Sequence, residues 1–91
     1  MKIWSRSLID KDGNESILIH TKEPRIGAFD LWEGGELIEF RHNHKKQETS
    51  IHSFVWVRGV CHYVKHIKTF KHEILADCEC EKFAEEYARG N

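Results

Sequence analysis

Glycine-containing turns separate short runs of β-branched and aromatic residues along most of this chain, and this arrangement restricts its fold more than any other feature. The first unit joins KIWSRSLID to ESILIHT through KDGN, where Asp12-Gly13 or Gly13-Asn14 supplies the positive φ that a hairpin turn needs. Pro24 then predicts a loop or a sheet edge, because proline cannot donate to a β ladder. The beginning of the chain is therefore predicted to form an antiparallel hairpin.

A second hairpin is predicted in IGAFDLWEGGELIEF, with its turn at Gly34-Gly35. This turn places Phe29 opposite Phe40. It likewise places Leu31 opposite Ile38, and we assign the shared face of these pairs to the core. The following HNHKKQETS has no periodicity and is predicted to be a loop.

The run IHSFVWV predicts a further strand, because it is rich in β-branched and aromatic residues. Two alternatives remain open for residues 60–69, which follow Arg58-Gly59. Their Val, Tyr, Ile, Thr and Phe content favours the return strand of a hairpin. A helix is equally compatible, because apolar residues recur at helical spacing at Val60, Tyr63, Val64 and Ile67.

The C-terminal segment predicts a helix with Asp77 as its N-cap and Gly90 as its C-cap. Glu79 and Glu81 lie where the helix dipole favours acidic side chains. The apolar stripe of this helix consists of Cys80, Phe83, Ala84 and Tyr87. The predicted fold is therefore one α+β domain over residues 1–91, with a five- or six-stranded antiparallel or mixed sheet built from hairpins. The C-terminal helix is expected to pack on one face of that sheet.

Charge is distributed unevenly, although the net charge of the chain is only −1. Residues 41–72 carry seven Lys or Arg and one acid, Glu48, a balance of +6, whereas residues 1–40 and 73–91 have balances of −3 and −4. The central segment also holds six of the seven histidines. Such asymmetry indicates an anionic partner for one face, unless the three segments interleave in the fold and neutralise one another.

Several classes of protein are disfavoured by the sequence. It has no apolar run near the ~18 residues of a membrane helix, and its beginning lacks the apolar region of a secretory signal. Three cysteines, two of them in Cys78-Glu79-Cys80, form a poor disulfide framework and favour a reducing, cytoplasmic compartment. No phosphate-binding glycine loop or Gly-x-Ser-x-Gly motif is present, so we expect a non-catalytic protein without a membrane partner, and a homodimer is compatible with its size.

The aromatic residues around Arg58-Gly59 suggest a binding face. A hairpin with this turn places Trp56 opposite Cys61 and Phe54 opposite Tyr63, with His52 and Lys65 on the same side. Such a face could stack nucleobases and attract phosphates, whereas the alternative is that the aromatic residues form the core of a small domain. The predicted contact residues are Arg41, His44, Lys45, Lys46, His52, Trp56, Arg58, Tyr63, Lys65 and Lys68. The expected partner is nucleic acid, or an acidic protein surface contacted by a small inhibitor or regulator.

Metal binding is the alternative function. His42 and His44 alternate and would share a face on a strand, whereas His62 and His66 would share a face on a helix. Cysteines at a helix start are expected to have depressed pKa values, because the helix dipole stabilises a thiolate. The predicted zinc or iron ligands are His42, His44, His62, His66, Cys78 and Cys80, although no Cys-x-x-Cys pair is present. Binding of an anionic partner, which is the leading prediction, requires no cofactor.

The stretches KIW, IGAFDLWEGGELIEFRHN and FVWVRGV, with the closing strand and helix, resemble in their order the nitrogenase iron-molybdenum cofactor biosynthesis family. The resemblance implies a ribonuclease-H-like carrier of metal clusters, with a helix over Val60–Thr69. It further implies cluster ligands at His42, His44, His52 and Cys61. The chain departs from the family pattern because HNHKKQETSIHS leaves no room for a helix and, apart from Gly59, the glycines after the central strand are missing.

Overall fold

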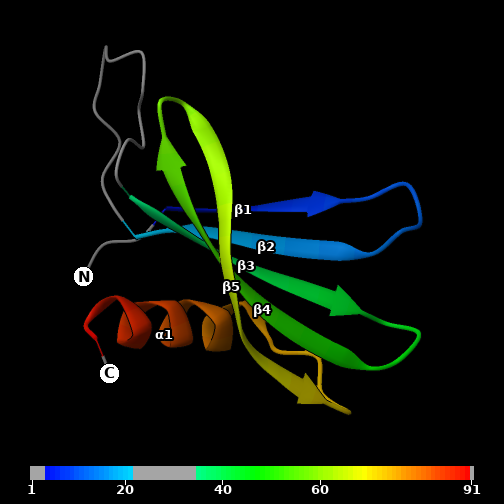
Figure 1. Cartoon of the computed structure of the whole chain (residues 1–91). Coiled ribbons are helices and arrows are strands. Elements are labelled where there is room, and N and C mark those ends of the chain that lie inside the picture. Colours follow the sequence, from blue (N-terminus) through cyan, green and yellow to red (C-terminus); the bar gives the residue numbers. More distant parts are fainter. Residues whose placement is uncertain (1–3, 22–34, 91) are drawn as a thin grey trace.

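A computed structural model of the protein describes residues 4–21 and 35–90. Its elements are β1 (Trp4–Ile9), β2 (Glu15–His20), β3 (Glu36–Asn43), β4 (Glu48–Val57), β5 (Val60–Lys71) and α1 (Asp77–Ala88). The five strands form one antiparallel sheet in the order β1-β2-β3-β4-β5, so strands adjacent in sequence are adjacent in space (Figure 1). The predicted α+β fold, with the helix after the sheet, is confirmed.

The first predicted hairpin is also confirmed. β1 and β2 pair from Trp4 opposite His20 to Ile9 opposite Glu15. Gly13 adopts a φ of +83°, which a residue with a side chain rarely reaches. The carboxylate of Asp10 accepts hydrogen bonds from the backbone N–H groups of residues 12 and 14, both at 2.9 Å, and thereby closes the turn.

The second predicted hairpin falls partly outside the described residues, which exclude Phe29, Leu31 and Gly34. In the described part, Phe40 lies between Ile17 of β2 and Ile51 of β4. Ile38 lies between Ile19 and Ser53 in the same way. Phe40 and Ile38 are both fully buried, so their assignment to the core is confirmed, but β2 and β4 supply their neighbours in the sheet.

The segment predicted as the loop HNHKKQETS is largely strand. β3 continues to Asn43 and β4 begins at Glu48, so that only residues 44–47 form the turn. Residues 60–69, for which two alternatives were open, belong to strand β5, and the helix implied by the family resemblance is wrong. The predicted pairs of Trp56 with Cys61 and of Phe54 with Tyr63 are confirmed. Pairing with β4 along its whole length stabilises β5 as a strand.

Two irregularities in the pairing of β4 with β5 change which side chains share a face. The register shifts between Ser53 and Phe54 and between Ile51 and His52, which leaves Val64 and Ile67 of β5 without partners opposite them. Lys65 consequently lies opposite Ser53, and His66 lies opposite His52. The prediction that Lys65 shares a face with His52 is therefore wrong.

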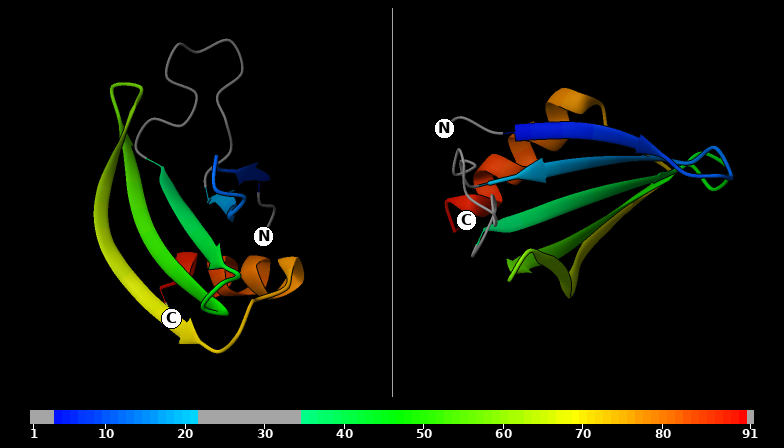
Figure 2. Two further views of the ribbon diagram at one scale, coloured as in Figure 1. Left: turned by 90° about the vertical axis from the view of Figure 1, so that its right-hand side faces the viewer. Right: turned by 90° about the horizontal axis from the view of Figure 1, so that it is seen from above.

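Helix α1 covers one face of the twisted sheet (Figure 2). The core between them consists of Ile17, Ile19, Ile38, Phe40, Ile51, Leu75, Cys80 and Ala84, with Ile67, Phe70, Phe83 and Tyr87 packed at its border. The Phe83 ring meets the rings of Phe40 and Phe70 edge-on, at centroid distances of 5.9 and 6.3 Å. The predicted apolar stripe of the helix is thus its buried face.

The ends of α1 differ slightly from the prediction. Ala76, and not Asp77, is the N-cap, and its backbone N–H donates to the Glu79 carboxylate at 3.0 Å. At the other end Arg89 is the C-cap, followed by Gly90 with a φ of +81°. Within residues 4–21 and 35–90, no helix has the length and apolar character that crossing a membrane requires.

Candidate functional site

The sheet has a second face, opposite α1, which we call the distal face. Alternation along the strands and the register between them place side chains of β2 to β5 there. They include Leu18, His20, Leu37, Glu39, Arg41, Ser50, His52, Phe54, Trp56, Tyr63 and His66. The distal face therefore collects several of the predicted contact residues.

One part of the distal face is buried. Leu18, His20 and Leu37 are each less than a tenth exposed. The indole N–H of Trp56 donates to Nδ1 of His20 at 3.4 Å, and the two rings stack with centroids 6.0 Å apart. Trp56, which was predicted to contact a partner, is thus engaged within the protein.

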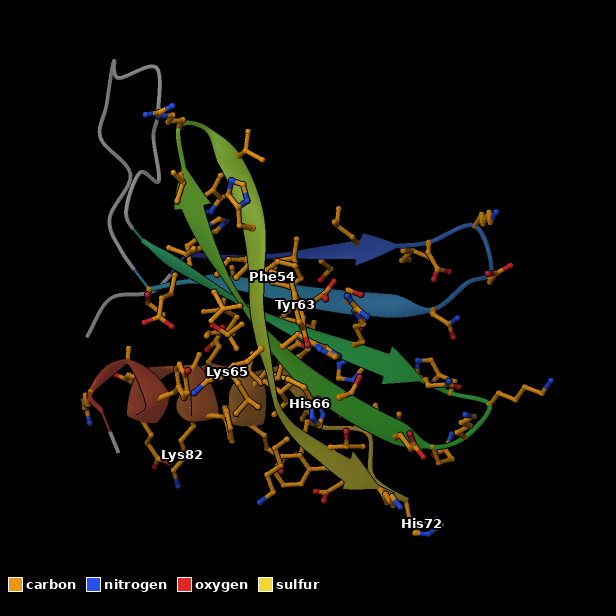
Figure 3. The ribbon with its side chains drawn as sticks, in the orientation of Figure 1. Phe54, Tyr63, Lys65, His66, His72 and Lys82 are labelled. Carbon is orange, nitrogen blue, oxygen red and sulfur yellow. The ribbon has the colours of Figure 1, made fainter. Side chains whose placement is uncertain are left out.

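Another part is a partly exposed aromatic cluster, which we define as His52, Phe54, Tyr63 and His66. Figure 3 labels Phe54, Tyr63 and His66. Tyr63 is 55 % exposed, and its ring meets the Phe54 ring edge-on with centroids 5.4 Å apart. The rings of His52 and His66 lie 5.2 Å apart. The register shift at Val64 brings His66 into this cluster, which regular strand alternation from Tyr63 would not have done.

Hydrogen bonds hold the two histidines of the aromatic cluster in place. The His52 ring contacts the Tyr63 hydroxyl through Nδ1 at 3.4 Å and the Ser50 hydroxyl through Nε2 at 3.2 Å. The His66 ring contacts the Thr69 hydroxyl at 2.7 Å. Burial lowers the pKa of His52, and the nearby Arg41 and His66 lower it further against the opposing effect of Glu39. His52 is therefore neutral at pH 7 and presents one donor and one acceptor.

A shallow hollow lies beside the aromatic cluster on the side of β1, and we call it the β1–β3 hollow. Its volume is about 500 Å³, and it is lined by Leu8, Ile9, Asp10, Ser16, Glu39 and Arg41. Arg41 donates through Nε to Oε1 of Glu39 at 2.5 Å, and their side chains are 51 % and 17 % exposed. Glu39 lies directly opposite His52 in the sheet, so the hollow adjoins the aromatic cluster.

The predicted basic residues do not gather on one face. His44, Lys45 and Lys46 lie in the β3–β4 turn, whereas Arg58 lies in the turn beyond the other end of β4, roughly 30 Å along that strand. Lys65 lies on the α1 side, with its ammonium 6.0 Å from the centroid of the Tyr87 ring (Figure 3). Lys68 is on that side too, opposite Ile51. Among the predicted contact residues, His52 and Tyr63 contact each other on the distal face, and Arg41 lies on the same face near His52.

The predicted metal ligands are also dispersed. His62 lies opposite Val55 and His66 opposite His52, and the register shift between them places these two histidines on opposite faces. Among the residues that the structure describes, no three His, Cys, Asp or Glu side chains are grouped to hold a metal ion. Cys80 is buried, and burial, with Asp77 and Glu79, raises the pKa of its thiol to about 12, which reverses the predicted depression. Cys78 is exposed.

A buried hydrogen-bond network on the α1 side was not predicted. The Thr49 hydroxyl donates to the backbone carbonyl of Glu73 at 3.2 Å and accepts from the backbone N–H of Leu75 at 3.0 Å. Its oxygen also lies 3.0 Å from Nδ1 of His42. Because the hydroxyl proton is used on Glu73, Nδ1 of His42 carries a proton and donates to Thr49. The network ties the segment before α1 to the sheet.

The His42 ring in this network makes stability depend on pH. Burial lowers the pKa of His42, and the nearby His44 lowers it further, whereas Glu15 and Asp77 raise it. Below the unfolded-state pKa of about 6.5 the unfolded chain therefore binds more protons than the folded protein. The urea midpoint is expected to fall as the pH drops from about 7.5 to about 5. The change His42→Gln should reduce this fall, whereas His62→Gln at an exposed position should retain it; an unchanged fall in His42→Gln would contradict the assignment.

Comparison with known proteins does not identify the chain. No protein-family model, no curated protein and no solved structure matches it. The resemblance to cofactor-biosynthesis carriers thus rests on the sequence stretches alone, and the helix that it implied over Val60–Thr69 is a strand. The arrangement of the distal face is the basis on which a function can be inferred.

Proposed function

We propose that the protein is a non-catalytic module that binds single-stranded nucleic acid on its distal face. The proposal rests on the exposure of Tyr63, a residue that is 55 % exposed on the distal face of the sheet next to Phe54. Aromatic rings on such a surface stack on unpaired bases, each stack contributing ~1–3 kcal/mol. Duplex bases are already stacked on each other, so a single strand suits this surface better.

The charges around the aromatic cluster support attraction of a phosphate backbone. Arg41 is exposed on the distal face, and Lys45 and Lys46 extend from the turn at the end of the same strand. Lys71 lies at the end of β5 that is nearest to this turn, opposite Glu48. Cationic side chains of this kind supply the part of the binding energy that does not depend on base sequence.

The acidic residues of the C-terminal segment are compatible with this proposal. They belong to α1, which lies on the other face of the sheet (Figure 2). The acidic side chains of the helix are Asp77, Glu79, Glu81, Glu85 and Glu86. The sheet thus lies between the acidic side chains of α1 and a single-stranded nucleic acid bound on the distal face, which weakens their repulsion of its phosphates.

Titration of fluorescent single-stranded DNA and RNA at rising salt concentration tests the proposal. Affinity is expected to fall with a log–log slope of about −0.7 per phosphate neutralised. The double change Lys45→Gln and Lys46→Gln should make the slope shallower by up to about 1.4, because two phosphate contacts are lost.

The matched control for this experiment is the double change Lys82→Gln and Arg89→Gln. It removes the same charge from α1 and its C-cap on the other side of the sheet, and should leave the slope unchanged. An absence of binding to single-stranded DNA and RNA at low salt would contradict the proposed function.

A further inference from the structure

The β1–β3 hollow differs in chemistry from the aromatic cluster beside it. Two carboxylates, of Asp10 and Glu39, line it together with one guanidinium, of Arg41. Carboxylates repel phosphate, so the hollow does not suit the backbone of a nucleic acid. They accept hydrogen bonds from N–H groups, and these occur on the edges of bases.

Glu39 and Arg41 retain hydrogen-bonding capacity toward a ligand. Their ion pair uses Nε of Arg41 and one lone pair of Oε1 of Glu39, which leaves the two Nη groups of the arginine, Oε2 of the glutamate and the second lone pair of Oε1. Within residues 4–21 and 35–90, no other side chain or backbone group donates to the Glu39 carboxylate. Because Glu39 is 17 % exposed and held by Arg41, its carboxylate is oriented before a ligand arrives.

The position of the hollow suits a base next to the one stacked on Tyr63. Glu39 lies opposite His52, and His52 contacts the Tyr63 hydroxyl at 3.4 Å. The hollow is therefore separated from β5 by two strand spacings, about 10 Å. A single strand lying across the sheet would present successive bases to the aromatic cluster and to the hollow.

The hydrogen-bonding edge of guanine complements the side chains of Glu39 and Arg41. Its N1–H and its exocyclic amino group are adjacent donors, which a carboxylate accepts together, and O6 beside them accepts from a guanidinium. Adenine and cytosine offer an amino group next to an acceptor nitrogen, and uracil offers one N–H between two carbonyls. We propose that the β1–β3 hollow is a guanine-reading subsite in which Glu39 accepts from N1–H and the amino group and Arg41 donates to O6. This inference rests on the proposed binding of single-stranded nucleic acid.

Fluorescence anisotropy with RNA of about eight uridines, a length within the site sizes of small single-strand-binding folds, tests the subsite. One central uridine is replaced in turn by guanosine, adenosine, cytidine or inosine. Guanosine is expected to tighten binding at least about fivefold relative to the other standard bases. Inosine, which lacks the amino group, should fall between guanosine and uridine.

The change Glu39→Gln should abolish the preference for guanosine, because a carboxamide offers one acceptor in place of two. Binding of the all-uridine RNA should be retained or strengthened, since one negative charge is removed. The control Glu36→Gln makes the same charge change on the other face of β3, where Glu36 contacts Ser53, and should retain the preference. Measurable but equal binding of all five RNAs, or a guanosine preference that survives Glu39→Gln, would overturn the subsite alone. Failure of every RNA to bind would overturn the proposed function as well.

Discussion

Replacement of Tyr63 by alanine is expected to weaken binding of single-stranded nucleic acid by roughly 5- to 150-fold without changing its salt dependence. Tyr63 is 55 % exposed and lies outside the core beneath α1, so removal of its ring takes away a stacking surface and little packing. No phosphate contact is lost, and the log–log slope against salt should therefore stay the same. Anisotropy titrations at several salt concentrations measure both quantities.

Two further variants separate stacking from other effects of this change. Tyr63→Phe retains the ring and loses only the hydroxyl that contacts His52 at 3.4 Å, so most of the affinity should remain. Val60→Ala alters another side chain of β5 that is 55 % exposed but lies outside the aromatic cluster, and should bind as the original protein does. Equal affinities of Tyr63→Ala and the original protein, both folded by circular dichroism, would contradict a role for Tyr63 in stacking.

The hairpins could be predicted from the sequence because each turn depends on neighbouring residues. Arg58 and Gly59 both adopt positive φ, of +52° and +75°, as the two-residue turns that match strand twist require. Once that turn is placed, the pair of Phe54 with Tyr63 follows from the alternation of side chains. Alternation also places His52 on the same side, so three of the four residues of the aromatic cluster could be predicted from the sequence.

The position of His66, the fourth residue of the aromatic cluster, could not be predicted, because it depends on a bulge at Val64 that has no local signal in the sequence. Val64 and Ile67 are β-branched residues that suit a regular strand, and nothing beside them indicates that they lack partners in β4. The first bulge turns Lys65 toward α1 and His66 toward His52. Strand alternation alone would have assigned both residues to the wrong face.

The sequence pattern underestimates the burial of polar side chains that hydrogen-bond to one another in the fold. His42 and Thr49 lie in a stretch without hydrophobic periodicity, which therefore resembled a loop, yet both are almost fully buried. Their contact at 3.0 Å removes the cost that usually keeps such residues at the surface. Cys80 shows the converse error, because burial against the sheet outweighs the helix dipole and raises the pKa of its thiol.

The largest effect on stability is expected from Thr49→Val, which should lower the free energy of unfolding by about 2–4 kcal/mol. Valine has nearly the same shape, so the change leaves packing intact and removes only the hydroxyl. Without it, the backbone N–H of Leu75 and the Nδ1–H of His42 lose their acceptor in a buried environment. Each buried donor left unsatisfied costs about 1–3 kcal/mol, because it was stripped of water on folding and has no replacement.

Urea denaturation followed by circular dichroism measures this loss, provided that the slope with denaturant stays constant. Thr69→Val is the matched control, because it removes a hydroxyl that contacts His66 at 2.7 Å on the exposed side of the edge strand β5. Water can replace that hydroxyl, so the control should lose less than about 1 kcal/mol. Thr49→Ser keeps the hydroxyl and should likewise retain most of the stability. Equal losses in Thr49→Val and Thr69→Val would show that the Thr49 hydroxyl does not tie the segment before α1 to the sheet.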